Sequence, residues 1–105
     1  MYYIYMIRCK DNSIYTGITT DLKRRLAEHQ QKTEKCAKYT YFHTAIKIEA
    51  AWKTENRKLA SQLEYCIKQL KKQEKEGLIQ DNSLFEHFFL DKLEEKDFER
   101  LLNIA

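Results

Sequence analysis

The first twenty residues alternate between hydrophobic and polar segments in the pattern of a β-hairpin. Residues 2–9 are dense in aromatic and β-branched side chains, and residues 14–18 repeat this composition. Both segments are typical of strands. The polar residues 10–13 between them have the chemistry of a turn. The pattern therefore predicts two antiparallel strands joined by a short loop.

The middle of the chain predicts a helix, an irregular stretch and a third strand. Thr20 or Asp21 can cap a helix over residues 22–31. Residues 32–41 are polar and lack a clear period, which indicates a loop. Residues 45–52 alternate apolar and charged side chains, as a half-exposed strand does.

Helical periodicity dominates the C-terminal half. Residues 55–73 carry one apolar stripe at helical spacing, residues 75–79 predict a short helix, and the Phe-rich residues 84–102 predict one or two amphipathic helices. We therefore expect an α/β (α+β) domain. Its three-stranded, mainly antiparallel sheet is flanked by helices and followed by an extra C-terminal amphipathic helical segment.

Composition narrows the protein class without naming an activity. The 105 residues are 43% hydrophobic and 33% charged, which fits one globular domain. No apolar run approaches the roughly 20 residues that span a bilayer, and the N-terminus lacks a signal-peptide pattern, so we expect a cytoplasmic protein without membrane contact. The net charge of +3 is compatible with binding phosphate but does not require it.

The cysteines and histidines do not form a zinc-binding pattern. The three cysteines are widely spaced, no C-x-x-C pair occurs, and the histidines do not complete a zinc spacing. We expect free, buried or half-buried thiols.

Three ordered motifs carry a family resemblance. The first is Y-T-G-I-T at 15–19 followed by Asp21, R-R-L at 24–26 and His29; the second is A-K-Y-T at 37–40; the third is L-E-Y-C-I-K at 63–68. In this order the chain resembles the GIY-YIG endonuclease superfamily, and within it the small single-domain bacterial branch. That branch is related to the catalytic domain of Slx-type structure-specific nucleases and to the N-terminal domain of excinuclease C.

The resemblance divides the chain into two parts. It covers residues 1–79, which would form the GIY-YIG-like nuclease domain, and leaves residues 80–105 as a helical extension packed on the same domain. Three positions depart from the family pattern. Tyr3 stands at the glycine of the G-I-Y half, Ile18 at a lysine of the excinuclease domain, and Tyr41 where this branch is expected to have arginine. The missing cation at Tyr41 should affect substrate affinity more than chemistry.

The resemblance implies a divalent-metal-dependent endonuclease that hydrolyses phosphodiester bonds, of DNA rather than RNA, with structured or branched DNA as suitable as linear duplex. By resemblance, Tyr5 and Tyr15 flank the attacking water and one of them is its general base. Arg25 would contact the scissile phosphate, and Glu64 would hold a single Mg²⁺ or Mn²⁺. Because tyrosine has an ordinary pKa of about 10, this mechanism requires a cation near the base.

The helix over residues 22–31 gives Arg25 and His29 an unusual setting. At 100° per residue both share the inward face with two leucines, whereas Glu28 points elsewhere. A cation on an apolar face needs a partner. Arg25 is therefore either a buried salt bridge to Glu64 or another acid, or a bidentate phosphate clamp. His29 is either a satisfied core histidine or a proton carrier and phosphate contact.

The remaining candidates also have two interpretations each. Glu64 could form a surface pair with Lys68, four residues on, instead of binding metal. Gly17 could end a strand, or let the backbone approach a phosphate, or both. Lys68 belongs either to a solvated helix face or to a phosphate-tracking surface.

A short polar segment is the candidate contact for a nucleic-acid strand. Lys38, Tyr39 and Thr40 would bind a strand through charge and stacking, or form a solvated loop.

Two alternatives to an autonomous nuclease follow from the same residues. The chain could be a non-catalytic nucleic-acid-binding module, although binding alone would not require the Glu64 carboxylate. It could also be a nuclease subunit that is active only with a partner protein. The Phe-rich segment would then serve as a homodimer or partner interface instead of completing the core.

Overall fold

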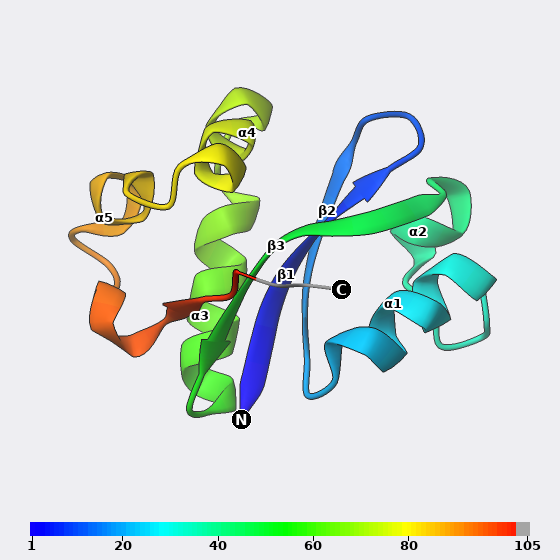
Figure 1. Cartoon of the computed structure of the whole chain (residues 1–105), viewed down its shortest axis with the longest axis horizontal. Coiled ribbons are helices and arrows are strands. Elements are labelled where there is room, and N and C mark those ends of the chain that lie inside the picture. Colours follow the sequence, from blue (N-terminus) through cyan, green and yellow to red (C-terminus); the bar gives the residue numbers. More distant parts are fainter. Residues whose placement is uncertain (103–105) are drawn as a thin grey trace.

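The computed structural model describes residues 1–102, in which a central antiparallel sheet lies between two groups of helices (Figure 1). Strands β1 (Tyr2–Cys9) and β2 (Ile14–Thr19) form the predicted hairpin, and β3 (Ala45–Thr54) pairs with the other edge of β1. The order is β2-β1-β3-β4, with every pair antiparallel. The predicted fold class is confirmed.

The sheet has a fourth strand that the sequence pattern did not predict. Strand β4 (Glu99–Arg100) pairs with Trp52 and Lys53 of β3. Two residues are too few to produce an alternating pattern, so the strand exists only because the edge of β3 offers unpaired backbone groups.

The turn between β1 and β2 explains the start of the hairpin. Asn12 has a φ of 71°, a left-handed conformation that asparagine adopts more readily than most residues. The Asp11 carboxylate accepts hydrogen bonds from the Ser13 backbone and hydroxyl at 3.1 and 2.6 Å. The resulting register places Tyr5 opposite Gly17.

In the described part of the chain, five α-helices cover the two faces of the sheet. Helices α1 (Leu22–Gln31) and α2 (Lys38–Phe42) lie on one side, and α3 (Arg57–Lys68), α4 (Lys72–Gln80) and α5 (Leu84–Phe89) lie on the other (Figure 1). Within residues 1–102 no helix has both the length and the hydropathy needed to cross a membrane.

The two helical layers explain why residues 4–7 of the central strand are all hydrophobic and buried. Ile4 and Met6 join the larger core, with Trp52 and the apolar stripe of α3, whereas Tyr5 and Ile7 join a smaller cluster beside α1. Alternate residues of β1 thus point to opposite faces, and both faces are buried. Tyr5 is thereby directed toward α1.

Two boundaries in the helical regions differ from prediction. The segment 55–73 ends as α3 at Lys68 and restarts as α4, where the Lys71 backbone donates to Glu74 Oε1 at 2.7 Å. Residues 32–41 are not a continuous loop, because α2 forms from Lys38. A five-residue helix is too short to show a period in sequence.

The C-terminal prediction of one or two amphipathic helices over residues 84–102 is confirmed only for α5, and the rest of that span is not a continuous helix. After α5 the chain continues through a 3₁₀ turn (Glu95–Asp97) into β4. A continuous helix would separate Phe85 and Phe98 by about 20 Å, whereas their ring centroids lie 5.6 Å apart. Phe85, Phe89 and Phe98 are buried in the larger core, so these side chains complete it and are not available as a dimer or partner interface. Residues 103–105 of the expected extension lie outside the described residues.

Arg8 ties four segments together at the far end of β1. Its guanidinium donates to Glu76 Oε1 and Oε2 of α4 at 2.6 Å each, to Glu49 of β3 at 3.0 and 3.1 Å, and to Asn12 in the hairpin turn. The bond to Arg8 lowers the pKa of Glu76 to about 2.

We predict that Arg8→Met lowers the free energy of unfolding by about 1–3 kcal/mol at pH 7, because two part-buried carboxylates lose a charged partner. The folded-state pKa of Glu76 lies below its unfolded value near 4.3. This stabilisation is therefore full above pH 4.3 and is lost as the pH falls toward 2. Chemical denaturation at several pH values should show that acid dependence in the wild type and a weaker one in the variant. Equal slopes for the two proteins would contradict the assignment.

Candidate active site

The hairpin, α1 and α2 bring together side chains that are distant in sequence. Helix α1 is capped at its start by Asp21, whose carboxylate accepts from the Arg24 backbone at 3.1 Å, and at its end by Lys32, whose φ is 53°. Because residues four apart share a helix face, Arg25 and His29 both point toward the sheet. They reach Tyr5, which β1 directs to the same face.

The Tyr5 hydroxyl is the centre of a buried hydrogen-bond network. Tyr5 is 1% exposed, and its hydroxyl oxygen lies 2.9 Å from His29 Nε2. Arg25 Nε donates to the same oxygen at 3.4 Å. Burial raises the pKa of Tyr5 to about 12, although the Arg25 hydrogen bond opposes this shift. The phenol therefore keeps its proton at neutral pH.

Thr40 decides which nitrogen of His29 carries the proton. The Thr40 hydroxyl donates to the Ala37 carbonyl at 3.2 Å, so it accepts from His29 Nδ1–H. His29 Nε2 is then the unprotonated nitrogen, and it accepts the hydrogen bond that Tyr5 donates. Burial, aided by the charge of Arg25, lowers the pKa of His29 to about 4. His29 is thus a neutral acceptor at neutral pH.

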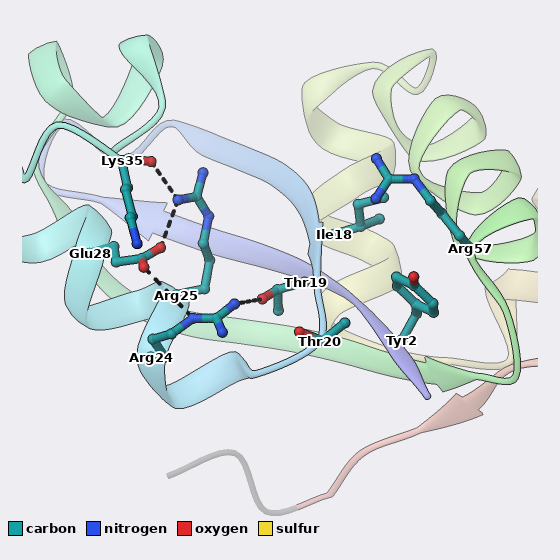
Figure 2. A pocket seen from close by; sticks show the side chains of 9 residues that line it. All are labelled: Tyr2, Ile18, Thr19, Thr20, Arg24, Arg25, Glu28, Lys35 and Arg57. Carbon is teal, nitrogen blue, oxygen red and sulfur yellow. Dashed lines mark hydrogen bonds and ion pairs between the residues drawn. The ribbon is translucent and has the colours of Figure 1, made fainter.

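Arg25 has an acidic partner, but not Glu64. Its Nη1 donates to Glu28 Oε1 at 2.9 Å and to the Lys35 carbonyl at 2.6 Å (Figure 2). The expectation that Glu28 points away from Arg25 is wrong, because residues three apart also lie side by side on a helix. Arg25 remains 21% exposed, so its guanidinium bridges the buried tyrosine and the surface.

Gly17 provides the space that the Tyr5 ring occupies. A Cβ built on Gly17 would lie 2.7 Å from Tyr5 Cζ, nearer still to the Tyr5 hydroxyl oxygen, and 3.2 Å from Tyr15 Cε2. The glycine lies within β2 and does not end it. The close approach seen here is that of a tyrosine side chain.

Glu64 and Lys68 belong to α3, and Lys68 approaches Tyr15. Glu64 Oε2 lies 3.5 Å from Lys68 Nζ, so the surface pair is formed. Lys68 Nζ lies 5.7 Å from the centre of the Tyr15 ring, and the charge of Glu64 contributes to the raised pKa of Tyr5. The Glu64–Lys68 pair therefore lies beside Tyr15 through its lysine.

The donor set near Glu64 is sparse but compatible with a hard cation. Within residues 1–102 no cluster of three or more His, Cys, Asp or Glu side chains could hold a metal. Magnesium accepts a single carboxylate and completes its shell with waters and substrate phosphates. The part-exposed Glu64, 24% accessible, fits such an arrangement.

Of the three residues predicted to contact a nucleic-acid strand, two are exposed and one is buried. Lys38 and Tyr39 are exposed, and the Tyr39 ring stacks between Tyr15 and His43, with centroid distances of 5.6 and 4.2 Å. Thr40 is fully buried, so its hydroxyl does not face a bound strand. Its place in the site is to orient His29. The sequence pattern does not reveal this role, because the contact joins α2 to α1 through tertiary packing.

We predict that Gly17→Ala destabilises the protein by about 1–3 kcal/mol and displaces Tyr5 from His29, since the added methyl group overlaps the Tyr5 ring. Gly77→Ala in α4 is the matched control. Its Cβ would meet only Leu84 Cδ1 at 3.2 Å, the end of a flexible side chain, and alanine favours a helix by about 0.5–1 kcal/mol. Thermal unfolding should therefore separate the two variants in opposite directions. Equal changes in the unfolding temperature of the two variants would contradict the steric explanation.

We predict that His29 titrates near pH 4, which NMR of its ring protons can measure directly. Its folded-state pKa lies below the unfolded value of about 6.5. The unfolded chain therefore binds the extra proton between these values, and stability is lost as the pH falls from 6.5 to 4. A His29→Gln variant should lack this dependence. A His29 pKa near 6.5 would contradict the buried, neutral assignment.

Comparison with known proteins identifies the family of the chain. Residues 1–77 match the GIY-YIG catalytic domain. The chain is 45% identical over 78 residues to UPF0213 protein FN1575 of Fusobacterium nucleatum, covering 74% of this chain and 76% of that protein. It is 44% identical over 85 residues to UPF0213 protein YhbQ of Salmonella typhimurium, covering 81% and 83%.

Among solved structures, the chain is similar to the solution NMR structure of UPF0213 protein BH0048 from Bacillus halodurans. The two are 38% identical, the match covers 76% of this chain and 84% of that one, and the TM-score is 0.49. The sequence similarity is what assigns the chain, since the catalytic-domain match extends over most of its length. The chain belongs to the GIY-YIG family.

Proposed function

We propose that this chain is a divalent-metal-dependent endonuclease that hydrolyses DNA phosphodiester bonds, including those of structured or branched DNA. The observation that supports this most is the Tyr5 hydroxyl, held between the cation Arg25 and the neutral acceptor His29. Such an arrangement suits proton transfer beside a phosphate better than it suits simple binding. Membership in a family of nuclease domains supports the same reaction class.

The proposed chemistry begins with an attacking water between Tyr5 and the half-exposed Tyr15. Tyr5 takes a proton from the water while passing its own proton to His29 Nε2, so no tyrosinate accumulates. In the resting protein this transfer is unfavourable, given pKa values of about 12 for Tyr5 and 4 for His29. A phosphate beside Arg25 would offset the charge that lowers the pKa of His29.

The other proposed roles follow from position. Arg25 reaches both Tyr5 and the surface, so it can hold the scissile phosphate beside the water. Glu64 would hold one Mg²⁺ or Mn²⁺, which when bound stabilises the charge on the leaving oxygen. Lys68 neutralises Glu64 until then. Gly17 fixes the position of Tyr5 through close packing.

The proposed substrate contacts are mainly to phosphate. The exposed cations Lys38 and Lys68 and the exposed Tyr39 ring lie around the tyrosines. Phosphate contacts orient a strand but carry little sequence information, so we expect weak sequence preference.

We predict that wild-type protein cuts labelled single-stranded, duplex, flap or branched DNA with Mg²⁺ or Mn²⁺. Tyr5→Phe, Tyr15→Phe and Glu64→Gln should each lower the rate at least about 100-fold, the usual effect of removing a catalytic proton carrier or charge. Tyr65→Phe is the matched control, because Tyr65 follows Glu64 directly but is 65% exposed. Its rate should stay within about twofold of wild type. Gel-resolved cleavage measures all of these.

Other outcomes would redirect the proposal. Binding without cutting by the wild type, unchanged in Glu64→Gln, would favour a nucleic-acid-binding module. Cutting that appears only after addition of a cell extract would favour a subunit that needs a partner. If the variants cut as fast as the wild type, the substituted residues would have no catalytic role.

A further inference from the structure

A cationic cleft is lined by Arg25 (Figure 2), the residue that also donates a hydrogen bond to Tyr5 of the tyrosine site. Its volume is about 440 Å³, and it is bounded by the end of β2, the first turns of α1 and the start of α3. Its lining comprises Tyr2, Ile18, Thr19, Thr20, Arg24, Arg25, Glu28, Lys35 and Arg57. Four of these side chains are cations and one is an acid, so the cleft favours an anion.

The single acid already behaves as a bound anion. Glu28 Oε1 lies 2.9 Å from Arg25 Nη1, and Glu28 Oε2 lies 3.7 Å from Arg24 Nε. Each carboxylate oxygen therefore faces a different arginine, as two oxygens of a phosphate would. These bonds lower the pKa of Glu28. The carboxylate stabilises two neighbouring guanidiniums that would otherwise repel each other.

Two other cations of the lining, Arg57 and Lys35, lack such a partner within residues 1–102. Arg57, at the start of α3, is exposed and faces the cleft across from the arginines of α1 (Figure 2). Within residues 1–102, neither the Arg57 guanidinium nor Lys35 Nζ takes part in a hydrogen bond or ion pair in this structure. Charged groups left in water beside a cleft of the same sign are available to a polyanion.

The cleft is continuous with the tyrosine site through Arg25, which indicates that its anion is a nucleic-acid strand. Arg25 donates through Nε to Tyr5 on one side and lines the cleft on the other. A strand whose scissile phosphate meets Arg25 would therefore extend into the cleft. Such a strand presents a phosphate at every nucleotide, which a single small anion would not.

We propose that the cleft binds the strand phosphates next to the scissile one, with Lys35, beside Glu28, and Arg57, across the cleft, as separate contacts and Glu28 as the internal counter-ion that a phosphate replaces beside Arg24. This inference rests on the proposed nuclease function for the identity of the strand. It adds Arg57, Lys35 and Glu28 to the residues that determine substrate affinity.

The test measures binding of a fluorescent oligonucleotide in EDTA, where no cleavage interferes, across a series of salt concentrations. Arg57→Ala should weaken binding about 3- to 10-fold and reduce the salt dependence by close to one phosphate contact. Lys58→Ala is the matched control, because Lys58 is the next residue of α3 and lines a different hollow. It should leave both quantities near wild type. Equal losses in the two variants would overturn the proposal.

Glu28→Gln tests the counter-ion. Removal of the competing charge should tighten oligonucleotide binding about 3- to 10-fold, with the fold checked by thermal unfolding. Unchanged or weaker binding by a folded Glu28→Gln protein would show that Glu28 is not displaced. That result would overturn this part of the proposal.

Inorganic phosphate separates a strand from a small ligand. In NMR titrations phosphate should shift the backbone amides of Thr19 and Thr20, and added oligonucleotide should reverse those shifts. Failure of the oligonucleotide to displace phosphate would assign the cleft to a small phosphate ligand and overturn the strand assignment.

These experiments distinguish failure of the cleft proposal from failure of the nuclease proposal. Loss of binding in Arg57→Ala with no cleavage by any protein would support the cleft alone. Normal cleavage with wild-type affinity in Arg57→Ala would support the nuclease alone.

Discussion

The arrangement of the site depends on one constraint, the need to satisfy the hydroxyl of a tyrosine buried at the centre of the sheet. Because β1 is covered on both faces, Tyr5 is only 1% exposed. Its hydroxyl must find partners within the protein, and an unpaired one would cost about 1–3 kcal/mol. Arg25 and His29 meet this need, which fixes the rotation of α1 against the sheet. Gly17 is required by the same packing, since any side chain there would displace the ring.

The sequence predicted those parts of the structure that depend on local patterns. The hairpin, α1, β3 and the class of fold follow from alternation, turn residues and helical periodicity, and the four-residue spacing placed Arg25 and His29 on one inward face. The parts it did not predict depend on partners distant in sequence. Strand β4 forms on the edge of β3, and Phe98 turns back to pack on Phe85. No local window contains that information.

In the candidate site, too, the sequence predicted individual residues but not the partners that are distant in sequence. Residue types and order pointed to Tyr5, Tyr15, Arg25 and Glu64, whereas their partners could not be predicted. Glu28 and Thr40 are the clearest cases. Glu28 was expected on another face, yet it lies three residues from Arg25 and so beside it on the helix. Thr40 belonged to an apparently polar loop, and only the packing of α2 against α1 makes its hydroxyl a buried partner of His29.

The two ends of Arg25 suggest how a small domain can keep a cation both ordered and available. Its Nε is held by a neutral phenol, which costs no charge, and its Nη1 is held by Glu28, an acid that stays 16% exposed. A fully buried ion pair would be hard to open, because separating it leaves an uncompensated charge. A pair at the rim of a cleft loses less, since water and an incoming phosphate can replace the carboxylate. The tyrosine bond can therefore persist while the carboxylate bond is exchanged. That asymmetry lets Arg25 respond to a phosphate without disturbing the buried network on which the fold depends.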